Sequence, residues 1–203
     1  RSQVFQDLNS NSIRDVFEPS AYTDSDGYFS YNPVTDVNYC ESTDADLREK
    51  YCLEALEGEY PIVITGGYDL LTDEPFYGTL SALVTVNDST DIGTGQIISP
   101  LTTLLTHIPD SASRNTVMTN LGVSSASLNR DFFNRTTNDT TDIAADISLF
   151  NLTQKLHKTV SAVGQTFEES FDVENEDDMP RDVTSYVYNQ LAQTLVSNSQ
   201  TLD

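Results

Sequence analysis

The sequence predicts an α+β protein, with a β-rich first half and a helical second half. Before about Ser99 the apolar runs are short, rich in β-branched and aromatic residues, and separated by turn residues, as in strands. After this point the apolar residues recur every three or four positions, which is the period of an amphipathic helix. We therefore expect a β-sandwich-like domain over residues 1–98 and a helical bundle domain over residues 99–203.

Three apolar segments of the first half are expected to form strands, namely residues 28–31, 61–65 and 79–86. Between the first two, residues 44–57 are expected to form a helical insertion that ends before Gly58. Three apolar residues of this insertion would share one face of the helix: Leu47, Tyr51 and Leu56.

The helical half begins with a clear start signal. Ser99 is a favoured N-cap residue, and Pro100 is favoured at the first helical position. We expect a helix here with an apolar stripe that consists of Leu101, Leu104, Leu105 and Ile108. A second short helix is expected over residues 111–121, ended by Gly122.

Two longer helices complete the prediction, one over residues 141–171 and one from Pro180 onward. The stripe of the first consists of Leu149, Leu152, Leu156, Val160, Val163, Phe167 and Phe171. The stripe of the second consists of Val183, Val187, Leu191 and Leu195. Gly164 lies inside the first helix, where it costs about 1 kcal/mol relative to alanine and allows a bend.

The chain is strongly acidic, with 32 Asp and Glu against 10 Lys and Arg, a formal net charge of −22. Such a surface repels phosphate backbones and anionic lipid headgroups, so we expect no nucleic-acid binding. No apolar run approaches the ~20 residues that a membrane-spanning helix needs, so we expect no membrane insertion. The excess of carboxylates favours cations, calcium among them, as partners.

Cys40 and Cys52 are the two cysteines of the chain. We read them as one disulfide, which would contribute about 3 kcal/mol in the chain-entropy picture. A disulfide would place the protein outside a reducing cytoplasm. The alternative is two separate small buried residues, since their spacing is not that of a zinc or redox motif.

Oxygen-bearing side chains recur in residues 7–18 with the spacing of a twelve-residue EF-hand-type calcium loop. Intervals of 2, 2, 4 and 3 separate the five side chains Asp7, Asn9, Asn11, Asp15 and Glu18. The main-chain carbonyl of Ile13 would fill the gap between Asn11 and Asp15. The pattern therefore predicts a calcium site, and the alternative is a polar surface turn rich in asparagine.

One residue departs from this loop pattern. Ser12 stands where such loops usually have glycine, and a non-glycine residue with positive φ carries a modest penalty. We therefore expect a weak site, in the extracellular range of about 0.1–1 mM. Pro19 after the loop breaks any helix, so a calcium switch between two helices is not expected.

A longer pattern adds a resemblance. The run Val4-Phe5-x-Asp7-x-Asn9-x-Asn11-x-x-x-Asp15-x-x-Glu18-Pro19, followed by Thr23-Asp24-x-Asp26-Gly27-x-Phe29, resembles the calcium-binding β-sandwich modules of large bacterial surface proteins and adhesins. These modules are relatives of the SdrD B-type and carboxypeptidase-regulatory-like families.

The resemblance implies a structural calcium ion in a module that spaces, rigidifies or presents something at the bacterial cell surface or outside the cell. Modules of this kind have residues ahead of their first strand, whereas Val4 and Phe5 stand close to the start of this chain. The resemblance therefore also suggests either a chain cut from a larger protein or a homopolymer completed by strand addition.

No enzyme signature is present in the sequence. It contains no GxSxG, HExxH, GxGxxG or phosphate-loop motif, and its two histidines, His107 and His157, are isolated. We therefore expect a non-enzymatic, calcium-stabilised structural or adhesion module of a bacterial surface protein, matrix protein or filament. The alternative is a carbohydrate- or ligand-binding module of a secreted protein, because eight of the ten tyrosines lie in the first hundred residues.

Overall fold

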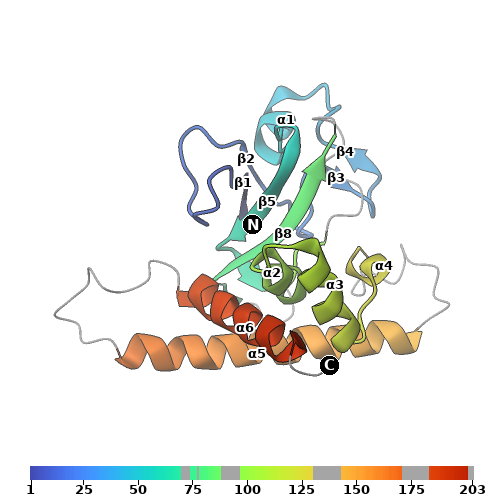
Figure 1. The fold of residues 1–203 in the computed structure, drawn as a ribbon. Helices are drawn as coiled ribbons and strands as arrows, with labels where there is room; N and C mark the ends of the chain where they lie inside the picture. Colours follow the sequence, from blue (N-terminus) through green and yellow to red (C-terminus); the bar gives the residue numbers. More distant parts are fainter. Residues whose placement is uncertain (70–73, 77, 88–96, 130–142, 171–182, 201–203) are drawn as a thin grey trace.

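A four-stranded antiparallel sheet occupies the upper part of the computed structural model, and most of its helices lie below this sheet (Figure 1). The structure describes residues 1–69, 74–76, 78–87, 97–129, 143–170 and 183–200. The order across the sheet is β2-β1-β5-β8. Its strands are β1 (Gln3–Gln6), β2 (Ser20–Tyr22), β5 (Gly58–Thr65) and β8 (Thr79–Val86). Two short hairpins pair β3 (Tyr31–Asn32) with β4 (Val37–Asn38) and β6 (Tyr68–Asp69) with β7 (Glu74–Pro75).

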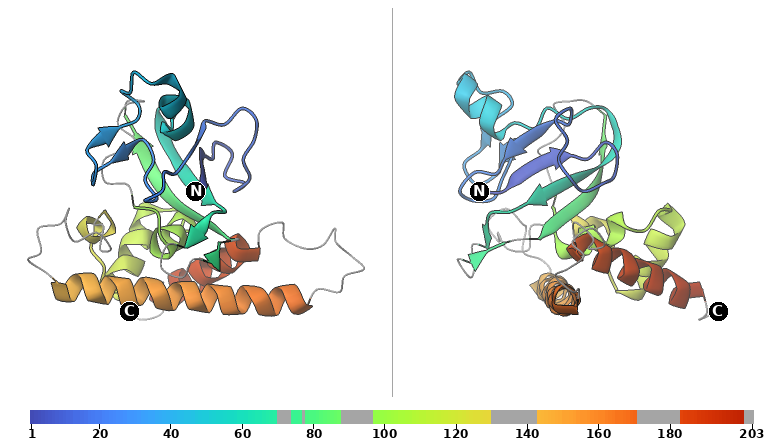
Figure 2. Two further views of the ribbon diagram at one scale, coloured as in Figure 1. Left: turned by 180° about the vertical axis from the view of Figure 1, so that it is seen from behind. Right: turned by 90° about the vertical axis from the view of Figure 1, so that its left-hand side faces the viewer.

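One helix lies beside the sheet and five lie below it (Figures 1 and 2). The described helices are α1 (Ala45–Tyr51), α2 (Pro100–Thr106), α3 (Ser111–Asn120), α4 (Ser125–Leu128), α5 (Ile143–Ser170) and α6 (Val183–Gln200). No helix in the described part of the chain combines the length and the apolar character that crossing a membrane requires. The predicted α+β class is confirmed. Within the described ranges the strands form one four-stranded sheet and two hairpins, and the predicted sandwich is not seen.

The sheet is buried on both faces. On one face its side chains join a loop phenylalanine and the segment after α1 in an apolar cluster, which consists of Val4, Ala21, Phe29, Leu53, Ala55, Ile62, Ala82, Val84 and Val86. On the other face Phe5, Val63 and Ser81 are neighbours by register, and all three are buried. Burial on both faces agrees with the near-continuous apolar character of β5 and β8.

The helix α2 closes part of the β8 edge. The main-chain N–H of Ser81 donates to Thr103 Oγ1 at 2.8 Å, and Thr102 Oγ1 donates to the carbonyl of Ser81 at 2.9 Å. Both threonines are buried in the first turn of α2, which starts at the predicted N-cap Ser99. Their hydroxyls therefore satisfy main-chain groups that an edge strand would otherwise expose.

The helices below the sheet share a second apolar cluster. Its buried members are Leu104, Leu105, Ile108, Val117, Met118, Val160, Val183, Val187, Tyr188 and Ala192. The predicted stripes of α2 and α6 supply much of it, and the sequence analysis did not include Tyr188 or Ala192. Gly122 ends α3 with a φ of +70°, as predicted.

The structure of the long helix α5 differs from its predicted apolar stripe at one point. Val163 is 37% exposed, whereas Gly164 is buried. A Cβ built on Gly164 would come within 3.9 Å of Val183 on α6. The glycine therefore lies at the contact between two helices, and α5 continues through it as helix. Phe171 and Pro180 lie outside the described residues.

Two predictions in the first half are wrong in their extent. The expected strand over residues 28–31 overlaps the observed β3 only at Tyr31, and the expected helix over residues 44–57 is reduced to α1. Asp44 caps α1, but the chain becomes extended at Cys52 because the residues that follow contact the sheet. Leu53 enters the sheet core, and both main-chain groups of Leu56 bind the buried Gln6 side chain at 2.7 and 2.8 Å.

Thr103→Val tests the closure of the β8 edge by α2. The substitution keeps the shape of the side chain but leaves the Ser81 N–H without its acceptor, so we expect the free energy of unfolding to fall by about 1–3 kcal/mol. Thr106→Val is the matched control, because its hydroxyl donates only to the Thr102 carbonyl within α2. Urea denaturation measures both changes, and equal losses in the two variants would contradict the assigned role.

Candidate functional site

The predicted calcium loop, residues 7–18, connects β1 to β2 and is anchored at both ends. At its start the Asp7 N–H donates to the Pro61 carbonyl at 2.9 Å, which extends the pairing of β1 with β5. At its end the Pro19 carbonyl accepts from the Gln6 N–H at 3.0 Å, which extends the pairing of β1 with β2. The sheet therefore holds the two ends of the loop next to each other.

The Asp7 carboxylate organises the first part of the loop. Its side chain is 1% exposed, and its two oxygens accept from the N–H groups of Asn11 at 3.1 Å and Ser12 at 2.8 Å. The backbone of Ser12 has a φ of +59°, so the position predicted to need a left-handed conformation adopts one without glycine. Ser10 is also left-handed, with a φ of +57°.

The Glu18 carboxylate ties the two ends of the loop together. It is 3% exposed, and its oxygens accept from the N–H groups of Leu8 at 2.8 Å and Asp15 at 2.9 Å. These two donors lie seven positions apart in the chain. One buried carboxylate therefore bonds to both the start and the end of the loop.

The remaining predicted ligands lie closer to the surface. The side-chain amides of Asn9 and Asn11 both donate to Asp15 Oδ2, at 2.8 and 3.2 Å. Their amide oxygens accept from main-chain N–H groups two positions later, Asn9 from Asn11 and Asn11 from Ile13. In the described hydrogen bonds Ile13 thus takes part through its N–H, whereas the sequence analysis assigned a role to its carbonyl.

The donor set suits calcium in chemical type, because it consists of carboxylate and amide oxygens. In the described arrangement these groups bond to one another and to the main chain. No group of three or more His, Cys, Asp or Glu side chains that could hold a metal ion is found among the described residues. Binding a cation would require the amides of Asn9 and Asn11 to release Asp15, so the assignment of the five ligands and of Ile13 stays a prediction.

The charge of the loop has no basic partner in the described part of the chain. Within that part, Arg48 forms an ion pair with Glu54 at 3.4 Å, and Arg114 forms one with Glu59 at 3.7 Å. Arg14, the basic residue of the loop, donates from Nε to Ser20 Oγ at 3.0 Å. The three carboxylates of the loop are therefore held by neutral N–H groups and amides.

A third buried carboxylate, Asp24, was not singled out by the sequence analysis as a site residue. It is 7% exposed and accepts four hydrogen bonds. One oxygen accepts from the N–H groups of Asp26 and Tyr28, both at 2.9 Å. The other accepts from Asn32 Nδ2 at 2.8 Å and from the Tyr39 hydroxyl at 2.7 Å. With four donors in place, Asp24 acts as a structural anchor for the hairpin β3–β4.

The phenol of Tyr39 is strongly affected by this environment. Burial, together with the hydrogen bond to the negatively charged Asp24 carboxylate, raises the pKa of Tyr39 to about 12. The ring of Tyr39 also packs against Tyr51 at a centroid distance of 5.0 Å. The neutral hydroxyl is therefore the form that the fold requires.

The predicted disulfide is confirmed. Cys40 and Cys52 are bridged, with their Cα atoms 4.9 Å apart. The bridge joins the end of the β3–β4 hairpin to the C-cap of α1. It adds a covalent link between the two segments that the rings of Tyr39 and Tyr51 also connect.

The two isolated histidines pack against aromatic rings, and the tyrosines of the first half differ in exposure. His107 stacks on Tyr188 with ring centroids 6.2 Å apart, and His157 contacts the ring of Phe76. Among the tyrosines of the first half, Tyr39 and Tyr51 are buried, whereas Tyr22 and Tyr68 are 46% and 59% exposed.

No protein-family model matches the chain, and comparison with curated proteins and with solved structures gave no match. The resemblance to calcium-binding surface modules therefore stays a prediction from the 4–29 pattern.

Tyr39→Phe tests the anchor at Asp24. Because the pKa of Tyr39 is higher in the folded state than the usual 10.0, its contribution to stability is complete below pH 10 and is lost as the pH rises toward 12. We expect the free energy of unfolding of the parent protein to fall between these pH values by about 2 kcal/mol more than that of Tyr39→Phe. Tyr68→Phe removes an exposed hydroxyl and should follow the parent curve. Parallel curves for the parent and Tyr39→Phe would contradict the assignment.

Proposed function

We propose that this chain is a non-enzymatic, calcium-stabilised structural or adhesion module that works outside the cell, at a bacterial surface or in a matrix or filament. The observation that carries the proposal is the state of Asp7 and Glu18. Both carboxylates are almost fully buried, and neither forms an ion pair within the described residues. Buried carboxylates are costly unless their charge is compensated.

The loop supplies the remaining chemistry for a cation. Asp15 lies beside Asn9 and Asn11, and its N–H is bound to Glu18, so four of the five predicted ligands belong to one hydrogen-bonded network. Asp7 joins the network through the Asn11 N–H. A bound calcium ion would compensate the negative charge of the three carboxylates of this loop. Asp15 would bind the ion in place of the side-chain amides of Asn9 and Asn11. The main-chain N–H groups that donate to Asp7 and Glu18 would keep the loop closed.

A structural role agrees with the position of the loop. It closes the β1–β2 pair, and β1 is a central strand of the sheet between β2 and β5. An ion that binds only the folded loop stabilises the folded state by mass action, about 2.7 kcal/mol at 100 times its dissociation constant. Calcium would thus stiffen the side of the four-stranded sheet that has its two shorter strands, β1 and β2.

The disulfide supports a location outside the reducing cytoplasm. Structural disulfides persist mainly in secreted and surface proteins. Millimolar calcium is also a property of such environments, and the affinity expected for this loop, about 0.1–1 mM, suits them. The excess of 32 acidic over 10 basic residues adds a general attraction for cations.

Thermal unfolding with and without calcium tests the proposal. We expect the melting temperature to be higher in excess calcium than in chelator by about 5–10 °C, which follows from the linkage energy and the size of the chain. Glu18→Gln should abolish most of this difference, because it removes one charge and one acceptor from the loop. Differential scanning calorimetry at constant ionic strength gives both values.

Glu57→Gln is the control, because it makes the same chemical change at an exposed position outside the loop. It should keep the calcium response of the parent protein. Magnesium at the same concentration should produce a smaller shift, because it prefers a tighter octahedral shell. Equal melting temperatures of the parent protein in calcium and in chelator would refute the calcium part of the proposal.

A further inference from the structure

Among the described residues, the β2 edge of the sheet has unpaired main-chain groups, whereas α2 covers part of the β8 edge. The outer strand β2 pairs with β1 through Ala21, and the neighbouring bonds Gln6 N–H to Pro19 and Thr23 N–H to Ser2 continue the same alternation. In an antiparallel pair the residues between these positions direct their main-chain groups away from the partner strand. The N–H and carbonyl groups of Ser20 and Tyr22 therefore face outward, and no hydrogen bond to them is found among the described residues. At the opposite edge Thr102 and Thr103 close the Ser81 position.

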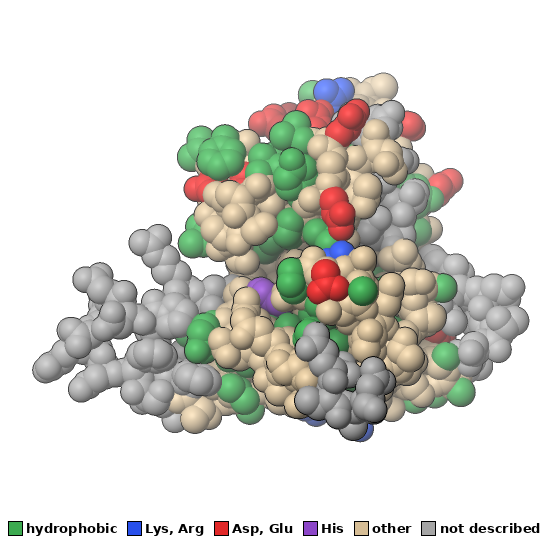
Figure 3. All heavy atoms as spheres, viewed as in Figure 1, with side chains coloured by type: hydrophobic (Ala, Val, Ile, Leu, Met, Phe, Trp, Pro, Cys, Tyr) green, Lys and Arg blue, Asp and Glu red, His purple; other side chains and the backbone are tan. Residues whose placement is uncertain are grey.

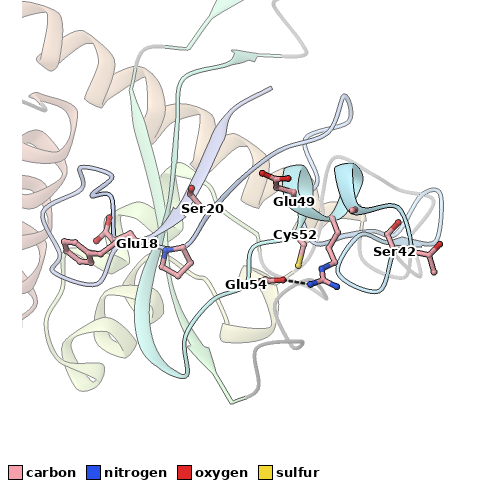
Figure 4. A pocket seen from close by; sticks show the side chains of 11 residues that line it. Glu18, Ser20, Ser42, Glu49, Cys52 and Glu54 are labelled. Atoms are coloured by element: carbon pink, nitrogen blue, oxygen red, sulfur yellow. Dashed lines mark ion pairs between the residues drawn. The ribbon is translucent and has the colours of Figure 1, made fainter.

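A groove of about 990 Å³ lies against this open edge. Figure 4 shows Glu18 and Ser20 on one side of it and Glu49 and Cys52 on the other. The second wall is one face of α1, since the residues that line it there follow helical spacing: Ala45, Arg48, Glu49 and Cys52. A strand edge that faces a helix across a groove is the geometry in which an extended peptide adds to a sheet.

The groove combines apolar and acidic surface. Phe17, which lines it, is 66% exposed, and its neighbour Val16 is 94% exposed. Hydrophobic side chains gather with acidic ones on the upper part of the face in Figure 3. Large apolar side chains that are exposed side by side mark interaction surfaces.

The charge around the groove selects the kind of partner. The positive charge of Arg48 is paired with Glu54 at 3.4 Å, and Glu49 forms no ion pair with a described residue. Residues 41–57 carry six acidic side chains and two basic ones. A second copy of this chain would bring its own net charge of −22 to the contact, which opposes self-association at low salt.

We propose that the groove between β2 and α1 binds an extended, basic segment of a partner protein, which adds as a strand to the edge of β2 through the main chain of Ser20 and Tyr22. Alternate side chains of the added strand would face opposite sides of the sheet. Its basic side chains would meet Glu49 and the neighbouring carboxylates, and its apolar side chains would contact Phe17. The proposal does not depend on calcium.

The test uses the whole chain, labelled with ¹⁵N, in a buffer that contains chelator, and follows its amide resonances during peptide titration. The probe is the peptide acetyl-Lys-Val-Lys-Val-Lys-amide. We expect saturable shifts at Ser20, Tyr22 and the α1 face. The acidic counterpart acetyl-Glu-Val-Glu-Val-Glu-amide should not bind. Because calcium is absent, a failure here is distinct from a failure of the calcium response.

Two N-methylated forms of the basic peptide test strand addition itself. One is methylated at both valines and the other at all three lysines, so each lacks the main-chain donors of one edge of the peptide strand. Strand addition predicts that one form loses binding and the other keeps it. Attraction by charge alone predicts that both forms bind equally, and this result would overturn the proposal.

Protein variants test the position of the site. Glu49→Lys should weaken binding about threefold to tenfold, as expected for reversal of a charge at a partly exposed contact. Glu57→Lys makes the same charge change outside the groove lining and should have a smaller effect, while circular dichroism confirms that both variants are folded. Equal weakening, no saturable binding at millimolar peptide, or occupation of the β2 edge by a second copy in sedimentation and cross-saturation experiments would each overturn the proposal.

Discussion

Buried carboxylates and amides that accept from main-chain N–H groups hold the first half of this protein together. Its short strands, β1 to β4, span two to four residues each and supply few ladder hydrogen bonds. Asp7, Glu18 and Asp24 replace these bonds by receiving the N–H groups of the intervening loops. Such networks are stable because every member is satisfied, and each loss would leave a buried donor unpaired.

The same constraint connects the two proposals. The buried carboxylates of the loop accept from neutral main-chain donors, and no cationic side chain among the described residues pairs with them, so both proposed ligands are positively charged. The proposed metal ion would bind inside the loop, whereas the proposed basic peptide would bind in the groove along α1. The groove wall depends on the Cys40–Cys52 bridge, because α1 has only seven residues and a helix of this length is not stable alone.

Local pattern predicted the regular elements well and the irregular ones poorly. The strand over residues 79–86 and the cap at Ser99 follow from short-range signals, and the structure has them where they were expected. The helix over residues 44–57 failed because Leu53 and Leu56 have tertiary partners that local periodicity does not reveal. The anchor at Asp24 joins Asn32 and Tyr39 across 8 and 15 positions, and no spacing rule distinguishes such a buried aspartate from one in an exposed turn. The loop residues were found by spacing, but their present hydrogen bonds could not be inferred from it.

The threonines at the start of α2 have a consequence for how the chain denatures. The sheet and the helices have separate apolar clusters, which by themselves would allow two independent melting events. Thr102 and Thr103, however, bond the first turn of a bundle helix to the middle of β8. Separation of the halves would leave the main-chain groups of Ser81 and the hydroxyls of Thr102 and Thr103 without these hydrogen bonds. The free energies of unfolding of the two clusters are therefore coupled. The described parts should therefore lose their structure in one cooperative transition.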